Sequence, residues 1–397
     1  DFQIINGGQT TASLSNTRYT SREKVNLTSI YVQMKLTVIE RARDDEEATK
    51  LVQDISRSSN SQNKVSDADF FSTHPFHVLM ERYSQRLGAR GTGGLQFETK
   101  WFYERARGQF LQSQMRLSPA KKKKFLLQHP KNQLITKTDL AKFRNTWDGV
   151  PHIVSKGAQT NFTEFAQKIN DAWDKSEGEL FTEKYYQESV AMCLIFRYTE
   201  SMIPKQSWYQ QGYRANIVTY TIALFHKLIQ EQFPKRDLDL LGIWTRQSVP
   251  IPVQRTLTEL SELVYDKLTD PLRGVENVTQ WCKREGCWNS VQTILYTLGA
   301  DIEDCLATQD EMQSTMRKAK RNRRIEKEVD TMTRVVEIQG MQWIDIMEFA
   351  INKRMVTPDE LIALRVACQL PNKIPNPVQS KKLIALLDRV YEEGYKL

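Results

Sequence analysis

Long apolar runs are missing from this sequence of 397 residues. The longest, such as residues 192–196 and 222–225, fall far short of the roughly 20 residues that a membrane-spanning helix needs. The sequence therefore excludes an integral membrane protein, and we expect no membrane partner.

Cysteine is also scarce. The chain has five cysteines, and only Cys282 and Cys287 lie near one another, without histidine close by. This spacing excludes a disulfide framework and a zinc site of the usual type.

The N-terminus carries no signal peptide, so we expect a cytoplasmic protein. Motifs for a serine-hydrolase elbow, a zinc-protease helix or a redox CxxC pair are absent.

The composition that is present predicts a globular protein, with 40% hydrophobic and 26% charged residues. From residue 101 onward, apolar residues recur at helical spacing and prolines separate the segments. Helices are expected at residues 101–116, 137–147, 161–175, 180–200, 214–232, 255–267, 287–298, 309–329, 341–352, 357–368 and 378–393.

The front of the chain has a different pattern. Residues 2–5 form a short apolar run that ends in two glycines, and residues 31–39 alternate in the manner of a second strand. We therefore predict an α+β protein, with a small N-terminal α/β portion followed by a large, mostly helical body. The expected divisions are residues 1–95, a basic aromatic helical segment at 96–160, and a helical body at 161–397.

Positive charge is concentrated in residues 101–150. This stretch has eleven Lys and Arg against three Asp and Glu, a net charge of +8 that equals the net charge of the whole chain. Aromatic residues such as Trp101, Phe125 and Trp147 lie between the cations. Cations bind phosphates and rings stack on bases, so the mixture suits nucleic acid. Alternatively, the cations form a solvated face and the rings enter the core. The candidate nucleic-acid-binding residues are Arg105, Arg107, Arg116, Lys121, Lys122, Lys123 and Lys124.

A second basic run follows at residues 317–324 and continues without glycine or proline. We expect it to be helical. Its simplest explanation is a charged surface helix with internal ion pairs. Contact with phosphate is the alternative.

Two polar stretches indicate a ligand pocket. In INGGQTT, the glycines allow a tight turn, and the following helix start offers backbone N–H groups to an anion. Residues 55–71 are rich in amides and hydroxyls, which suits either a surface loop or the wall of a polar site. We expect the two stretches to form one pocket. The candidate ligand-binding residues are Asn6, Gly7, Gly8, Gln9, Thr10, Thr11, Asn60, Gln62, Asn63 and Lys64.

Residues for catalysis are less clear. A nuclease that uses Mg²⁺ needs clustered carboxylates and a lysine. Asp67 and Asp69, together with the ExK triplet of Glu98 and Lys100, are the candidates. Each also has a simpler explanation, since Asp67 and Asp69 are suited to cap a helix. Any cofactor is otherwise unknown.

Taken together and in this order, INGGQTT, NSQNKVSDADFF, KWFYERARGQ, TKTDLAK and VSKGAQTNF resemble the AIPR family of abortive-infection phage-resistance proteins. The resemblance implies a more distant similarity to DGQHR-type and ParB-like proteins, in which the glycine turn and the NSQNK-like loop share a pocket. Thr10 and Thr11 replace the His-Arg pair of those relatives. It also implies a restriction-endonuclease-type domain before INGGQTT, and since the chain starts at Asp1 without methionine, we expect a piece of a longer protein.

Three hypotheses result. In the first, this is a fragment of a bacterial phage-defence protein that recognises nucleic acid or a nucleotide, with cleavage carried mainly by an upstream domain. In the second, the chain is itself a metal-dependent nuclease or nucleotidase. In the third, the helical body is an oligomerisation scaffold and the basic segment is merely solvated. A homo-oligomer is compatible with all three.

Overall fold

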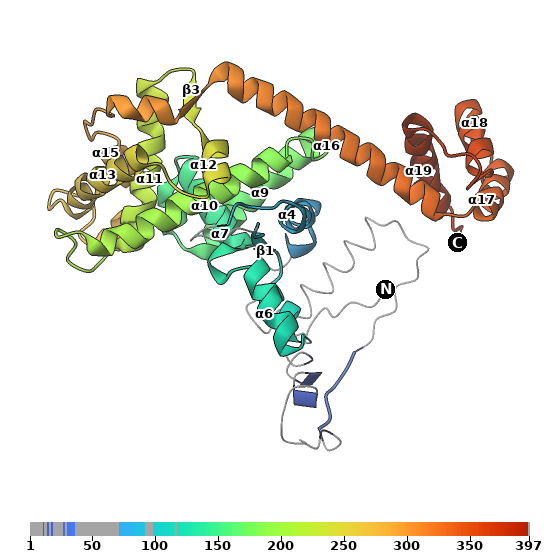
Figure 1. Cartoon of the computed structure of the whole chain (residues 1–397), viewed down its shortest axis with the longest axis horizontal. Helices are drawn as coiled ribbons and strands as arrows, with labels where there is room; N and C mark the ends of the chain where they lie inside the picture. The colour runs from blue at the N-terminus through green and yellow to red at the C-terminus, as the bar shows by residue number, and fades with distance from the viewer. Residues whose placement is uncertain are drawn as a thin grey trace. The chain divides into compact units, whose positions relative to one another are not determined.

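The computed structural model in Figure 1 describes residues 71–91, 98–115 and 117–395, together with a few isolated positions before residue 36. The chain divides into two compact units. One is Val65–Lys320, and the other contains Arg321–Leu397. Each unit is described by itself below.

The Val65–Lys320 unit is mostly helical. Its elements, in chain order, are the 3-10 helix η2 (Phe71–Thr73), α4 (Pro75–Arg86), β1 (Phe102–Glu104), α5 (Gln109–Met115), α6 (Pro119–Gln128), η3 (Lys131–Gln133), β2 (Leu134–Thr136), α7 (Lys137–Trp147), α8 (Pro151–Ser155), α9 (Ala158–Ser176), α10 (Glu183–Met202), η4 (Ile203–Lys205), α11 (Arg214–Gln232), β3 (Arg236–Leu238), α12 (Leu240–Arg246), α13 (Ile251–Thr269), α14 (Val278–Trp281), α15 (Glu285–Val291), η5 (Ala300–Cys305) and β4 (Leu306–Thr308).

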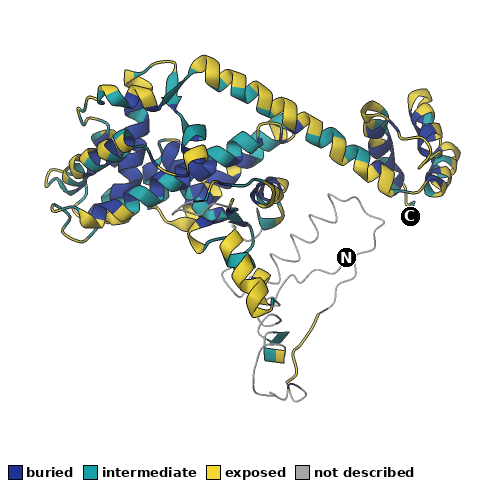
Figure 2. Ribbon diagram, viewed as in Figure 1, coloured by how far each residue is buried: buried dark blue, intermediate teal, exposed yellow. Residues whose placement is uncertain are grey.

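Helix α11 is the centre of this unit. Twelve of its nineteen residues are buried, including Tyr220 and Phe225 at 0% exposure. It packs against α7, α8, α10 and α13, and Figure 2 shows it as largely buried. A helix that is apolar on most sides must lie inside a larger fold. Helix α11 therefore supports the elements around it.

Polar residues cap the N-termini of several helices. Thr136 and Asp139 form a reciprocal capping box at the start of α7, in which the Asp139 N–H donates to Thr136 Oγ1 over 3.1 Å. Ser118 caps α6 and Thr182 caps α10 through their side-chain oxygens. Such caps each stabilise a helix by about 1 kcal/mol, because they bind N–H groups that the helix itself leaves unpaired.

The strands are short and were not predicted at these positions. Residues 102–104 pair in parallel with residues 134–136, and residues 236–238 pair antiparallel with residues 306–308. The helix expected at residues 101–116 is therefore wrong in its first part. Only Gln109–Met115 is helical, because Phe102–Glu104 pairs with a strand about thirty residues further on.

Helix α16 (Gln309–Glu337) begins in the first unit and ends in the second. The second unit continues with α17 (Gly340–Asn352), α18 (Pro358–Ala367) and α19 (Pro377–Glu392). Its core is small and includes Trp343, Leu364 and Leu387. The Trp343 Nε1–H donates to the Val335 carbonyl over 3.1 Å, which ties α17 to the end of α16. The expected helices at 341–352, 357–368 and 378–393 are confirmed to within a residue or two.

The mostly helical body is thus confirmed. The small N-terminal α/β portion is not confirmed, because most of it lies outside the described residues. Within the expected strand at residues 31–39, positions 31–35 are described, and they are exposed and not part of a strand.

Candidate nucleic-acid interface

Several predicted site residues lie outside the part of the chain that the structure describes. This holds for the pocket residues of INGGQTT up to Thr10 and for those of NSQNK. It also holds for Asp67, Asp69 and Arg116. Thr11 is described, as an exposed residue in a helical turn. The expected pocket between the two polar stretches therefore stays a prediction.

Helix α6 carries the lysine run on its surface. Lys121, Lys122, Lys123 and Lys124 are all exposed, and α6 has no buried residue at all. None of the four forms an ion pair with a described carboxylate. Figure 2 shows α6 as mostly exposed, in contrast to the buried helices of the same unit. Four positive charges without an ion-pair partner in the described part of the chain thus lie together on one short helix.

The position of these lysines is unfavourable for the helix itself. They occupy its first half, where the helix dipole already gives positive partial charge, and no acidic residue lies in the first turn. Lys121 and Lys124 are also like charges at i and i+3, a spacing that destabilises a helix by a few tenths of a kcal/mol. Helix formation therefore does not explain this run. Bound anions would neutralise both effects.

Apolar residues accompany the lysines on α6. A surface hollow of about 420 Å³ is lined by Pro119, Lys122, Lys123, Leu126 and Leu127. Leu127 is 48% exposed. Lysines beside an apolar surface suit a ligand that has both phosphates and flat apolar rings. Nucleic acids have both kinds of group.

The aromatic residues of the basic segment are occupied in packing. Trp101, Phe143 and Trp147 are each at most 5% exposed. Phe125 lies with its ring centroid 5.6 Å from that of Phe110, in a cluster that fixes α6 to β1. Trp101, Phe143 and Trp147 thus enter the core, as the alternative explanation holds, and their stacking on bases is not supported. Phe125 is half-buried and packs against neighbouring rings.

Two predicted cations beside α6 differ from each other. Arg105 donates from Nε to Glu81 Oε2 over 2.5 Å and from Nη1 to the Ser72 carbonyl over 3.1 Å. Arg107 is exposed. Arg105 would have to release Glu81 before it could bind a phosphate, whereas Arg107 would not.

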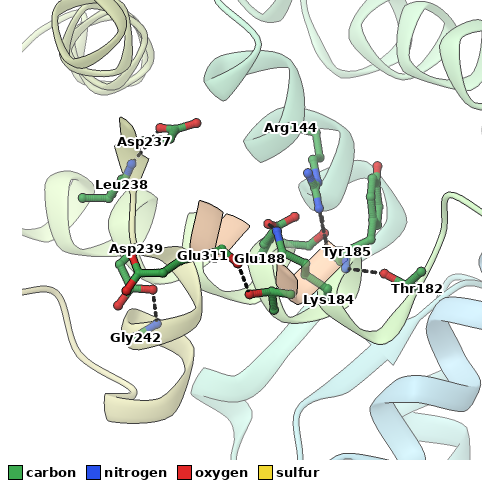
Figure 3. Close-up of polar contacts among 12 residues, drawn as sticks. Arg144, Thr182, Lys184, Tyr185, Glu188, Asp237, Leu238, Asp239, Gly242 and Glu311 are labelled. Carbon is green, nitrogen blue, oxygen red and sulfur yellow. Dashed lines mark hydrogen bonds and ion pairs between the residues drawn. The ribbon is translucent and has the colours of Figure 1, made fainter. Parts of the chain in front are cut away.

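Other cations of the basic segment are buried. The Arg144 guanidinium donates to Ser189 Oγ over 2.7 Å and to the Tyr185 carbonyl over 2.5 Å, and it lies 3.6 Å from the centroid of the Tyr185 ring. Figure 3 shows this arrangement beside the cap that Thr182 makes to the Tyr185 N–H. Arg144 therefore connects α7 to α10 and is unavailable to a ligand.

The ExK triplet is held by local contacts. The Lys100 Nζ donates to the Gln85 carbonyl over 2.5 Å. Glu98 lies against Gly88, where a Cβ atom would approach its Oε2 to 2.3 Å. Among the described residues, His, Cys, Asp and Glu nowhere come together in groups of three or more as metal ligands.

The histidines near the triplet have structural contacts. His74 caps α4 by accepting from the Phe76 N–H over 3.2 Å. His77 Nδ1 lies 2.6 Å from the Tyr103 hydroxyl, and its ring is stacked on those of Tyr103 and Phe162. Burial, with smaller effects from Lys137 and other nearby cations, holds the pKa of His77 well below its usual value. His77 is therefore a neutral core residue.

The second basic run is helical, as expected. It lies within α16, and most of its cations are exposed. Arg324 Nε is 3.5 Å from Glu328 Oε1, an internal ion pair of the predicted kind.

Within the described residues, every helix is too short or too polar to span a membrane.

These features define a mostly helical protein with an exposed lysine-rich helix and a packed aromatic interior. Residues 1–272 match the AIPR protein family, and the chain belongs to this family. The family predicted from the motifs is thus confirmed, and membership supports a role in phage defence. No curated protein and no solved structure matches the chain.

Proposed function

We propose that this AIPR-family chain is a phage-defence protein that binds nucleic acid, and that α6 provides the principal contact to phosphate. The observation that carries the proposal is the run of four exposed lysines without carboxylate partners among the described residues, at the end of a helix where positive charge is unfavourable. Arg107 is a further exposed cation of the same basic segment. Family membership supports the biological setting, and the electrostatics of α6 favour an anionic ligand.

Contact through α6 alone would be independent of base sequence. Lysine ammonium groups bind phosphate as point charges, and the rings of Trp101, Phe143 and Trp147 are buried. We therefore expect binding that depends strongly on salt and little on sequence. The polar pocket of INGGQTT and NSQNK is the proposed source of selectivity. There, Gly7 and Gly8 would shape the turn, while Gln9, Thr10 and Asn63 would hydrogen-bond the ligand and Lys64 would bind its phosphate.

The direct test is binding of labelled oligonucleotides, in single-stranded and duplex DNA and RNA forms, at low salt. Replacing residues 121–124 with Gln should weaken binding by about tenfold or more, because each substitution removes one phosphate contact. A matched control removes four charges elsewhere on the surface. It carries Gln at the exposed residues Lys175, Lys205, Lys373 and Lys381.

Equal weakening in both quadruple variants would mean that only the net charge matters, and would contradict the assignment to α6. Binding that does not respond to salt would instead favour the oligomerisation scaffold. The proposed pocket has its own test, since Gly8→Val should weaken binding and leave the melting temperature unchanged. Loss of both together would mean that the glycine serves only the fold.

Cleavage of nucleic acid is a second candidate for this chain. Incubation of the labelled oligonucleotides with Mg²⁺ or Mn²⁺ tests it, and cleavage that Glu98→Ala abolishes would support a nuclease built from Asp67, Asp69, Glu98 and Lys100. Binding without cleavage would agree with the view that another part of the intact protein performs the reaction.

A further inference from the structure

A cavity on the Val65–Lys320 unit brings together two segments that are far apart in the sequence. It has a volume of about 560 Å³ and is lined by His152, Ile153, Lys156, Lys283, Arg284 and Glu285. The first three belong to α8 and its C-cap, and the last three to the turn that leads into α15. None of these residues lies on α6.

Both walls of the cavity are attached to the buried helix α11. On one side, the Asn216 Nδ2–H donates to Ser155 Oγ over 3.0 Å at the end of α8. On the other, the Tyr220 hydroxyl donates to the Cys282 carbonyl over 2.7 Å, directly before Lys283. Helices α11, α8 and α15 pack against one another, and α11 and α15 can be followed in Figure 1. The cavity is therefore preformed, which lowers the entropic cost of binding a ligand.

Three cations line this cavity without a partner of opposite charge. Lys156, Lys283 and Arg284 form no ion pair with any carboxylate that the structure describes, although Glu285 lies on the same rim. Because no described carboxylate pairs with these three cations, their positive charges repel one another. A bound phosphate removes this repulsion, since lysine binds phosphate as a point charge and arginine through its planar fork.

One further group indicates what else the ligand carries. Glu285 is exposed at the first position of α15. A carboxylate accepts hydrogen bonds and would repel a simple polyanion. A ligand with hydroxyl or amino donors next to its phosphates would instead donate to Glu285. The Nδ1 atom of His152 is buried without a hydrogen-bond partner in the described structure, so it is not open to such a ligand.

From these contacts we infer that the cavity between α8 and α15 binds the phosphate groups of a small nucleotide, with Lys156, Lys283 and Arg284 on the phosphates and Glu285 on a donor of the nucleoside. The volume lies within the range of about 300–1,000 Å³ that is typical of small-molecule sites. Residues 283–285 follow the family match, which ends at residue 272, so the complete cavity is not a feature of the matched region.

Calorimetric titration of the whole chain with pyrophosphate and with metal-free ATP tests this site. Lys283→Gln with Arg284→Gln should weaken the binding of both probes by about tenfold or more, because two charge-assisted contacts are lost. The control is Lys175→Gln with Lys205→Gln, which removes the same charge from exposed positions and should leave both affinities unchanged. All four substitutions are at surface residues, and unchanged melting temperatures verify folding.

The variant Glu285→Ala tests the nucleoside contact separately. Pyrophosphate should bind more tightly without the carboxylate, while the preference for ATP over pyrophosphate should fall severalfold. The inference is overturned if neither probe binds, if the control pair weakens binding as much as the cavity pair, or if the ATP preference is unchanged. A loss of oligonucleotide binding in the cavity pair without any binding of the small probes also overturns it, in favour of a polymer site. The α6 variant should bind both probes normally, so the two proposals fail separately.

Discussion

Helices α6 and α7 come from the same basic segment and use their cations in opposite ways. On α6, Lys121 to Lys124 are exposed and lack carboxylate partners among the described residues. On α7, Arg144 is 9% exposed and bonds to α10. Both helices carry several cations and at least one aromatic residue, but α6 has no buried residue whereas most of α7 is buried. Composition therefore finds a basic segment, but exposure decides which of its cations are available to a ligand.

The largest effect on stability is expected at Arg144. Replacing it with Ala should lower the free energy of unfolding by about 2–4 kcal/mol, because Ser189 and the Tyr185 carbonyl lose a buried charged donor and the ring contact is lost. Urea unfolding measures this change. Ser189→Ala, which removes one of the acceptors, should cost less. A loss below about 0.5 kcal/mol for Arg144→Ala would mean that α7 does not depend on this contact.

A smaller loss of stability is expected at Arg105. Its exposure lies between that of the buried Arg144 and that of the exposed lysines on α6. Its side chain is 30% exposed and that of Glu81 is 14% exposed. Arg105→Gln should lower the free energy of unfolding by about 1 kcal/mol, as is typical of a partly screened ion pair. Its effect on oligonucleotide binding should be weaker than that of Lys122→Gln. The reverse order would mean that Arg105 leaves Glu81 and joins the ligand.

The pH dependence of stability should reflect the buried His77. Burial lowers its pKa in the fold, so the unfolded chain takes up a proton at a higher pH than the folded chain does. The free energy of unfolding should therefore fall as the pH drops below about 6.5, the usual pKa of histidine. His77→Gln should reduce this fall between pH 7 and pH 5. An identical pH profile in the variant would show that other groups cause it.

Almost no loss of stability is expected from α6. With Gln at residues 121–124, the free energy of unfolding should rise by a few tenths of a kcal/mol, since repulsion with the helix dipole is relieved and Gln is nearly as good a helix former as Lys. A loss of 1 kcal/mol or more would mean that these lysines stabilise the fold, as Arg144 does. The contrast between the two helices would then be wrong.

The sequence predicted the long helices well because their signals are local. Residues 137–147 and 214–232 were expected to be helical, and α7 and α11 have the same limits. Helix α6 was missed as an element because it buries no residue, so no apolar stripe marks it. Strand β1 lies where the spacing of apolar residues predicts a helix, because its pairing partner, β2, is about thirty residues further along the chain.

A sequence displays residues that are adjacent in the chain, but not the contacts that only the fold brings about. The lysine run could be identified because its four members are adjacent in sequence. The roles of Arg144 and His77 could not, since Ser189 and Tyr103 approach them only in the fold. The cavity between α8 and α15 also gave no signal, because residues 152–156 and 283–285 are far apart in the sequence and come together only in the fold. Charge runs are visible in a sequence, whereas their partners are not.

The central claim is that α6 binds phosphate, and the slope of log binding constant against log salt concentration tests it most directly. For a duplex, this slope should become shallower by up to about 3.6 when residues 121–124 are replaced with Gln, because each of the four phosphate contacts contributes about 0.9. The control with Gln at Lys175, Lys205, Lys373 and Lys381 should retain the original slope. An unchanged slope in the α6 variant would contradict the account.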